Sequence, residues 1–278
     1  MISFLFQKIK IKMKIGLLIT ARLKSSRLPF KLVKDLNGYT IIEHVINRSK
    51  KICDVEGIVL CTSTNPQDKP LVDIAMKNGI HYYLGSEEDV LQRLADTSDF
   101  FSFDYILSIT GENPLFSIDY ANQIVNKLKK DEDDFVIADG LPIGCGVYGL
   151  KVKALKTVCA IKKEVDTEIW GPLINRPELF QVSSIKVDDY FTRRNLRLTN
   201  DYPEDFQMMN KIFNNFAPKS TPSLLDALNF LDDNPEVLKI NAHRKQAALS
   251  KEMVDRIDLF FTQNDEKIRY IKNIIYNT

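Results

Sequence analysis

The sequence has few cysteines, no long apolar run and almost no net charge. Its four cysteines never occur at Cys-x-x-Cys spacing, so neither a zinc site nor a disulfide framework is indicated. This cysteine usage fits a reducing, cytoplasmic setting. No run of about 18 or more apolar residues is present, so no membrane-spanning helix is expected. A formal charge of +1 over 278 residues gives no general attraction to nucleic acid or to an anionic membrane.

Familiar catalytic and nucleotide-binding patterns are also missing. The chain contains no Gly-x-x-x-x-Gly-Lys-Ser/Thr loop, and the polar loop after its first apolar run is not a Gly-x-Gly-x-x-Gly turn. The three histidines are dispersed, and no Ser/His/Asp or Cys/His arrangement is indicated. Basic and aromatic residues do not interleave as they do on a nucleic-acid surface. Any phosphate site must therefore depend largely on side-chain cations.

Such cations are concentrated in the loop that follows the first apolar run. Residues 15–19 (IGLLI) predict a buried strand, and residues 20–31 (TARLKSSRLPFK) follow it directly. A strand, a basic loop and a helix from about Thr40 form an arrangement that is typical of an anion site. Charge and donors at this density suit a triphosphate, whereas a solvated surface loop is the alternative. The cations and hydroxyl donors of this loop are Arg22, Lys24, Arg27, Lys31, Ser25 and Ser26.

Strand and helix patterns alternate through the first half of the chain. We predict further strands over residues 57–62, 81–84, 105–109 and 135–138, and helices over 67–78, 87–99 and 118–130. Alternation of this kind with apolar strands predicts an α/β fold, with a mainly parallel sheet and helices on both faces. Beyond residue 139 the pattern weakens. There we expect an irregular strand over 141–150, helices over 151–164, 201–215, 224–231 and 251–276, and a strand over 181–187.

The pattern divides the chain into three parts. Residues 1–13 contain an apolar core that is too short for a signal peptide, and we interpret them as an N-terminal extension without function. Residues 14–217 form the α/β domain. Residues 218–278 follow two prolines and read as a helical C-terminal segment appended to the sheet.

Polar residues follow four of the predicted strands. Ligands of parallel sheets bind beyond the carboxyl ends of the strands, so these four loops are expected to converge on one edge. The loops are Thr20-Ala21-Arg22, Thr62-Ser63, Gly85-Ser86 and Thr110-Gly111-Glu112.

Glu112 and Asp201 are the candidate metal ligands. A carboxylate directly after a buried strand and opposite a triphosphate loop is placed to hold Mg²⁺, which takes its remaining ligands from phosphate and water. The segment around Asn113-Pro114 is equally well explained as a turn. Asp201 is equally well explained as the cap of the helix that follows it.

Two other segments allow a structural or a ligand-binding interpretation. Ser86 with an acidic residue three positions on reads as a capping box, although Ser86, Asp89 and Arg93 could also contact a ligand. Thr62 and Ser63 could recognise a base or only end a strand. Glu168, with Trp170, could contact an acceptor, whereas an acidic surface turn is the plainer interpretation.

Taken together, these segments resemble the spore-coat polysaccharide cytidylyltransferase-like family, which is related to the CMP-KDO and CMP-sialic acid synthetases. The resemblance runs in order from about residue 14 to residue 215. Its blocks are residues 21–31 (ARLKSSRLPFK), 61–68 (CTSTNPQD), 85–93 (GSEEDVLQR), 110–115 (TGENPL) and 198–205 (LTNDYPED).

The resemblance implies a nucleotide-diphosphosugar transferase-like (GT-A type) fold and an enzyme that transfers CMP from CTP, with release of pyrophosphate. The acceptor would be an acidic sugar or a related phosphorylated or phosphonate compound, used in surface polysaccharide or glycoconjugate synthesis. With the composition, we expect a cytoplasmic homodimer that uses Mg²⁺ and binds neither nucleic acid nor membrane. Arg22, Arg27 and Lys31 would be catalytic, and Glu112 and Asp201 would hold the metal. Asn113 and Glu168 would contact the acceptor. The nucleotide would be bound by Thr20, Ala21, Arg22, Ser25, Arg27, Lys31, Thr62, Ser63, Ser86 and Thr110.

The sequence departs from the family pattern in two places. The family usually has Asp where Glu112 stands, and a run similar to Glu-His-Val-Thr where residues 167–170 read Thr-Glu-Ile-Trp. Two alternatives to a cytidylyltransferase are a glycosyltransferase that uses a ready-made nucleotide sugar and a non-catalytic nucleotide-binding protein of the same fold. A glycosyltransferase needs an Asp-x-Asp-like motif at a strand end, and the acidic pairs at 188–189 and 232–233 do not form a convincing one.

Overall fold

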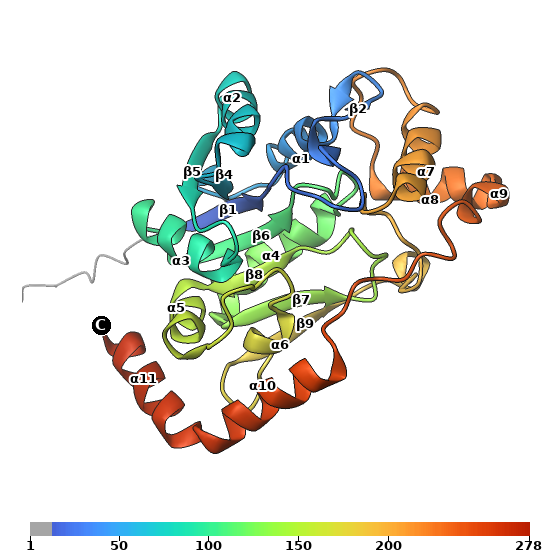
Figure 1. Ribbon diagram of the computed structural model, residues 1–278. Helices are drawn as coiled ribbons and strands as arrows, with labels where there is room; N and C mark the ends of the chain where they lie inside the picture. Colours follow the sequence, from blue (N-terminus) through green and yellow to red (C-terminus); the bar gives the residue numbers. More distant parts are fainter. Residues whose placement is uncertain (1–12) are drawn as a thin grey trace, which may run out of the picture.

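The structure is a computed structural model that describes residues 13–278. The strands of its main sheet are β1 (Ile15–Thr20), β4 (Gly57–Ser63), β5 (His81–Gly85), β6 (Tyr105–Thr110), β7 (Phe135–Asp139), β8 (Tyr148–Lys151) and β9 (Val182–Lys186). Across the sheet they lie in the order β5-β4-β1-β6-β8-β7-β9 (Figure 1). All neighbours are parallel except that β8 runs antiparallel to both β6 and β7. The prediction of a mainly parallel sheet is confirmed.

Helices cover both faces of this sheet. One face packs against α1 (Ile41–Ser49), α2 (Lys69–Lys77), α4 (Ile118–Asp131), α7 (Pro203–Phe213), α8 (Leu224–Asp233) and α9 (Pro235–Leu238). The other packs against α3 (Val90–Phe100), α5 (Val152–Ile161), α6 (Gly171–Ile174), α10 (Lys251–Gln263) and α11 (Asp265–Asn277). The central strand β1 supplies both cores, since Leu17 faces the first group and Leu18 the second. Continuous apolar runs were therefore a correct sign of strands buried on both faces.

The helix predicted from residue 87 begins later than expected. It is α3, and its N-cap is Asp89, whose carboxylate accepts a hydrogen bond from the amide of Gln92 at 3.1 Å. Ser86 Oγ accepts from the amide of Asp89 at 3.1 Å and so stabilises the turn before the helix. The prediction that Ser86 caps the helix is wrong because Asp89 stands directly before the first buried residue, Val90.

The prediction that Asp201 caps the following helix is also wrong. Helix α7 begins at Pro203, and the carboxylate of Asp205 accepts from the amides of Asp201 (3.1 Å) and Tyr202 (3.0 Å). Because Asp205 accepts from these two amides, the carboxylate of Asp201 is available to pair with Lys31.

Three further differences are local. The strand expected over residues 141–150 is limited to Tyr148–Lys151, because Gly140 and Gly144 adopt positive φ angles of 117° and 90° that break an extended chain. The helix expected over 251–276 divides into α10 and α11 at Asn264. A short antiparallel hairpin of β2 (Asp35–Leu36) and β3 (Tyr39–Thr40) was not predicted.

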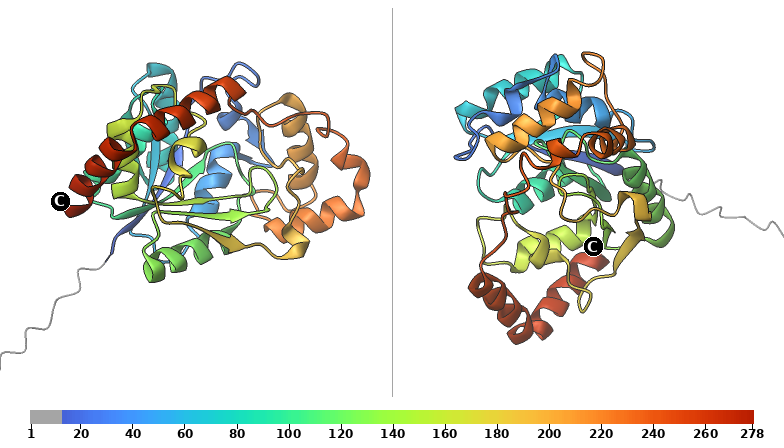
Figure 2. Two further views of the ribbon diagram at one scale, coloured as in Figure 1. Left: turned by 90° about the horizontal axis from the view of Figure 1, so that it is seen from below. Right: turned by 90° about the vertical axis from the view of Figure 1, so that its right-hand side faces the viewer.

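The C-terminal part of the chain wraps around both faces. Figure 2 shows α10 and α11 as an outer layer, and α11 packs against α5. Buried Arg48 of α1 joins the other end of this region to α1 and to the segment between β6 and α4, since it donates to the carbonyls of Phe116 (2.7 and 2.9 Å) and Pro222 (2.5 Å). The division at residue 217 stays a prediction, and residues 1–12 of the expected extension lie outside the described residues. Within residues 13–278, no helix has the length and apolar character needed to cross a bilayer.

Candidate active site

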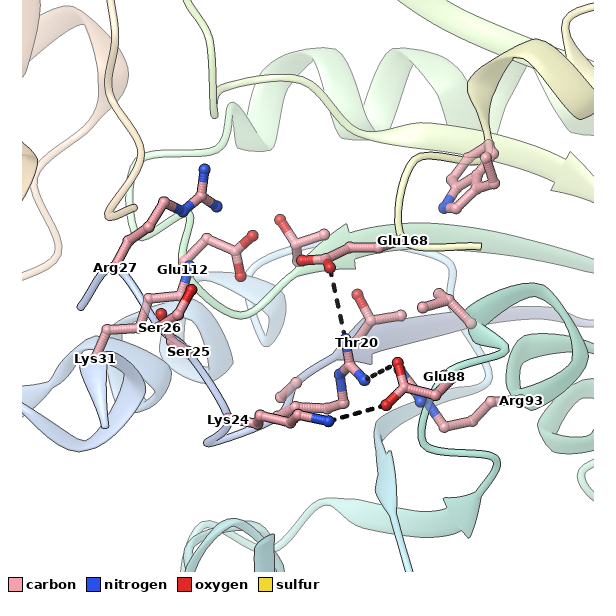
Figure 3. Close-up of a pocket in the computed structure, with 15 residues that line it drawn as sticks. Thr20, Lys24, Ser25, Ser26, Arg27, Lys31, Glu88, Arg93, Glu112 and Glu168 are labelled. Atoms are coloured by element: carbon pink, nitrogen blue, oxygen red, sulfur yellow. Dashed lines mark hydrogen bonds and ion pairs between the residues drawn. The ribbon is translucent and has the colours of Figure 1, made fainter. Parts of the chain in front are cut away.

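A polar pocket opens at the carboxyl ends of the central strands β1 and β6. Its volume is about 440 Å³, within the range of small-molecule sites. Two of the four predicted loops line it, those after β1 and β6, and residues of the 88–93 and 164–170 segments line it as well. Figure 3 shows Arg27, Lys31 and Glu112 toward one end and Glu88, Arg93 and Glu168 toward the other. The lining therefore joins cations and carboxylates that lie far apart in the sequence.

The basic loop is held in shape by Asp68, which sequence reasoning missed. The buried carboxylate of Asp68 accepts from the amide of Leu23 at 2.7 Å and from the hydroxyl of Ser63. At the end of the loop, Phe30 takes a left-handed conformation (φ 53°), after which Lys31 begins a 3-10 turn. The signal that could have found Asp68 is its place at the end of the 61–68 block of the family resemblance.

Lys31, Arg27 and Asp201 form the ionic centre at the first end of the pocket. The ammonium of Lys31 lies 2.8 Å from Oδ1 of Asp201, and a guanidinium nitrogen of Arg27 lies 3.3 Å from the same oxygen. Both Lys31 and Asp201 have side chains that are only 11% exposed, so solvent screens this pair weakly. Arg197 approaches the other oxygen of Asp201 at 3.5 Å.

Burial and charge oppose each other in setting the pKa values of this pair. Burial lowers the pKa of Lys31, but the carboxylates of Glu112 and Asp201 outweigh it and raise that pKa above its ordinary value. Burial likewise raises the pKa of Asp201, but Lys31, Arg27 and Arg197 outweigh it and hold that pKa below its ordinary value. Both groups are therefore charged over the physiological range, and Glu112 lies close enough to act on Lys31.

At the other end of the pocket, Arg22 lies between two carboxylates. It donates to the carbonyl of Glu87 at 2.6 Å, and it lies 3.4 Å from a carboxylate oxygen of Glu88 and 3.6 Å from one of Glu168 (Figure 3). Lys24 contacts Glu88 at 3.0 Å and Glu87 at 3.3 Å. Its hydrogen bonds to Glu88 and Glu87 raise the pKa of Lys24. These two cations are thus already compensated by acids of the chain.

The loop that carries Glu168 is fixed to the start of α3. The hydroxyl of Thr167 donates to the carboxylate of Asp89 at 2.9 Å and accepts from the amide of Leu91 at 2.9 Å. Lys162 pairs with the same carboxylate. Asp89 therefore caps α3 and also positions the neighbour of Glu168, a role that no local pattern indicated.

The structure brings together only part of the predicted site. The pocket is lined by Thr20, Ala21, Arg22, Ser25, Arg27, Lys31, Thr110, Glu112 and Glu168, and Asp201 contacts two of these residues. Thr62, Ser63, Ser86 and Asn113 are not among the lining residues. Ser63 donates to Asp68, and Asn113 donates to Thr110 Oγ1 at 2.6 Å. Their assigned roles stay predictions, and for Ser63 and Asn113 the contacts point to support of the loops.

Glu112 and Asp201 are the carboxylates of the site that could hold a divalent metal ion. Within residues 13–278, no cluster of three or more His, Cys, Asp or Glu side chains is poised to hold one. Two carboxylates are nevertheless enough for Mg²⁺, which takes its other ligands from phosphate and water. The carboxylate of Glu112 makes no hydrogen bond or ion pair with another described residue, so its oxygens can accept a metal. Oδ2 of Asp201 is less occupied than Oδ1.

A family model described as Cytidylyltransferase matches residues 17–252. The chain belongs to the cytidylyltransferase family. It is therefore an enzyme of the nucleotidyltransferase class, and the resemblance to spore-coat polysaccharide cytidylyltransferases is confirmed.

Individual relatives agree with the family. The uncharacterized protein MJ1063 of Methanocaldococcus jannaschii is 32% identical over 236 residues, which cover 84% of this chain and 97% of that protein. The spore coat polysaccharide biosynthesis protein SpsF of Bacillus subtilis is 23% identical, covering 79% of this chain and 94% of SpsF. A solved cytidylyltransferase from Leptospira borgpetersenii superposes with a TM-score of 0.76 at 24% identity, over 86% of this chain and 100% of that one. This last likeness shows the fold alone.

For a cytidylyltransferase, the pairing of Glu88 with Arg22 and Lys24 leads to a prediction. Glu88→Gln is expected to lower the KM for the nucleoside triphosphate about fivefold, since a surface charge contact is worth about 1 kcal/mol. The variant removes a negative charge that competes with the phosphates for the two cations. Steady-state kinetics at low and high salt test this, because screening should shrink the difference. Glu266→Gln on α11 is the matched control, and an unchanged or higher KM in Glu88→Gln would contradict the prediction.

Proposed function

We propose that this cytidylyltransferase transfers CMP from CTP to a small acidic sugar, or to a related phosphorylated or phosphonate acceptor, and releases pyrophosphate. The product would serve surface polysaccharide or glycoconjugate synthesis. One observation carries the proposal: Lys31 and Arg27 line a pocket together with Glu112, and both contact Asp201, although up to 174 positions of sequence separate them from it. The family and its SpsF relative support the class of reaction and the kind of pathway.

The chain's own residues would act by charge and alignment. An oxygen of the acceptor attacks the α-phosphorus of CTP in line, a new P–O bond forms, and the bond to the β-phosphate oxygen breaks. Arg27 and Lys31 neutralise the charge that grows on the departing pyrophosphate, and Arg22 assists from the opposite side. Ser25 and Ser26 also line the pocket and supply hydroxyl donors for the phosphates.

Glu112, together with Oδ2 of Asp201, is the set that would hold Mg²⁺. Bound there, the ion would supply positive charge against the triphosphate. The cytidylyltransferase family generally uses a divalent metal, which supports this part of the proposal. Glu112 instead of Asp extends the carboxylate by one methylene, so we expect Glu112→Asp to retain metal dependence.

The acceptor would bind at the end of the pocket formed by Glu168, with Trp170 beside it in the lining. Asn113 would act through Thr110, to which it donates, and Thr62, Ser63 and Ser86 would shape the loops around the nucleotide. We include in the proposal a cytoplasmic homodimer that binds neither nucleic acid nor membrane.

The test is a panel of the four nucleoside triphosphates crossed with acidic sugars, sugar phosphates and phosphonates. Pyrophosphate release with CTP and one acceptor class supports the proposal. Release of free nucleotide from a nucleotide sugar would identify a glycosyltransferase instead. Binding of CTP in a thermal-shift assay without turnover of any acceptor would identify a non-catalytic nucleotide-binding protein.

A further inference from the structure

Asn200 is a buried amide that the catalytic scheme does not use. It lies directly before Asp201 and is 0% exposed. Its Nδ2 donates to the backbone carbonyl of Glu112 at 3.0 Å. Among the described residues, this is the side-chain hydrogen bond that links the segment 198–201 to the turn 110–113 after β6. The two carboxylates of the proposed metal site are carried by the two segments that this bond joins.

The side-chain oxygen of Asn200 accepts no hydrogen bond from the part of the chain that the structure describes. Oδ1 of Asn200 is buried and has no hydrogen-bond partner among the described residues. Leaving a buried polar atom unpaired is costly, and an apolar side chain of similar size would avoid this cost. Packing alone therefore does not explain an asparagine here. The bond to Glu112 is what the side chain provides.

The segment before Asn200 is independently anchored. Ile143 pairs with it through two backbone hydrogen bonds, from the amide of Ile143 to the carbonyl of Leu196 and from the amide of Leu198 to the carbonyl of Ile143, both at 2.8 Å. The approach is close, since a Cβ on Gly144 would lie 2.5 Å from the carbonyl oxygen of Leu198. Because these contacts fix the backbone just before Asn200, the hydrogen bond from Asn200 holds the backbone of Glu112 in a defined position.

We propose that Asn200 is a positioning residue that sets the separation of the Glu112 and Asp201 carboxylates. The proposal rests on the proposed function, because the separation matters only if both carboxylates serve one divalent ion. Groups that hold metal ligands in place typically change metal affinity or activity by 10- to 100-fold when they are removed. Asn200 does not touch substrate in this scheme and acts through Glu112.

The experiment compares Mn²⁺ binding in Asn200→Leu and wild-type protein, followed by EPR with α,β-methylene-CTP present. We expect at least tenfold weaker Mn²⁺ binding and a similar fall in kcat, while the KM for CTP at saturating metal changes less than about twofold. The matched control is Asn210→Leu, since Asn210 makes the same kind of bond, 3.0 Å long, to the carbonyl of Phe206 inside α7. Asn200→Ser, which is smaller and keeps a donor of shorter reach, provides a second variant if the leucine disturbs folding.

The outcomes separate this inference from the function on which it rests. Weaker Mn²⁺ binding in both Asn200 variants but not in Asn210→Leu supports the inference. Equal Mn²⁺ binding in wild-type protein and a folded Asn200 variant overturns it and leaves the proposed function intact. If wild-type protein with the nucleotide analogue binds no Mn²⁺ at all, the metal site of the proposed function fails, and this inference fails with it.

Discussion

Lys31→Ala is expected to lower kcat by about 10²- to 10³-fold, because one preorganised charged donor at a transition state is typically worth about 3–4 kcal/mol. Lys31 is the least exposed cation that lines the pocket apart from Arg93, and its ammonium is fixed by the contact with Asp201 at 2.8 Å. Its raised pKa keeps it charged while pyrophosphate departs. Pyrophosphate release under saturating CTP and acceptor measures the effect.

The control for Lys31→Ala is Lys34→Ala. Lys34 lies three residues further on, outside the pocket lining, with its ammonium 5.6 Å from the ring centre of Phe206. It carries the same charge, so a general electrostatic effect would appear in both variants. Unchanged turnover in Lys31→Ala would count directly against the role of the basic loop.

Asp201→Asn is expected to destabilise the fold by about 3 kcal/mol at pH 7, because removing one partner of a nearly buried ion pair leaves the other charge uncompensated. Lys31 would lose its contact, and Arg27 and Arg197 would lose part of theirs. Urea denaturation gives the free energy of unfolding. Asp258→Asn on α10 is the control, since Asp258 pairs with Arg176 but is 53% exposed.

The effect of Asp201→Asn should depend on pH in a defined direction. The folded state lowers the pKa of Asp201, so its carboxylate contributes stability above the ordinary value of 3.8. That contribution disappears as the pH falls through the lowered pKa of the folded state. The wild-type protein and the variant should therefore differ most near pH 7, and the difference should shrink as the pH falls below 3.8. A difference that stays constant from pH 7 to pH 3 would contradict the charge-based explanation.

The sequence was most reliable where a local pattern reports burial. Apolar runs such as 15–19 and 105–109 identified strands because a strand buried on both faces needs apolar residues at every position. The basic loop was identifiable for a related reason: four cations in ten residues have few structural uses directly after a buried strand. These signals lie within one segment and need no knowledge of the chain path.

Sequence reasoning failed where several acceptors compete for the same local task. Asp201, Asp205, Ser86 and Asp89 all carry side chains that can cap a helix. Which of them caps a helix depends on where the first buried helical residue lies, and for α3 this residue is Val90, directly after Asp89. Ser63 shows a related ambiguity, since its hydroxyl donates to Asp68 within its own loop, and its role toward a nucleotide stays a prediction.

By itself, the sequence determined the α/β architecture, the family and the composition of the basic loop, because these follow from local burial patterns and from ordered blocks of residues. Only the tertiary structure decided which charges meet. Lys31 and Asp201 are 170 positions apart, and Arg22 meets Glu88 and Glu168 from two further loops. Ion pairs form between side chains that the chain path brings within a few ångströms, and that path is set by packing of the whole core.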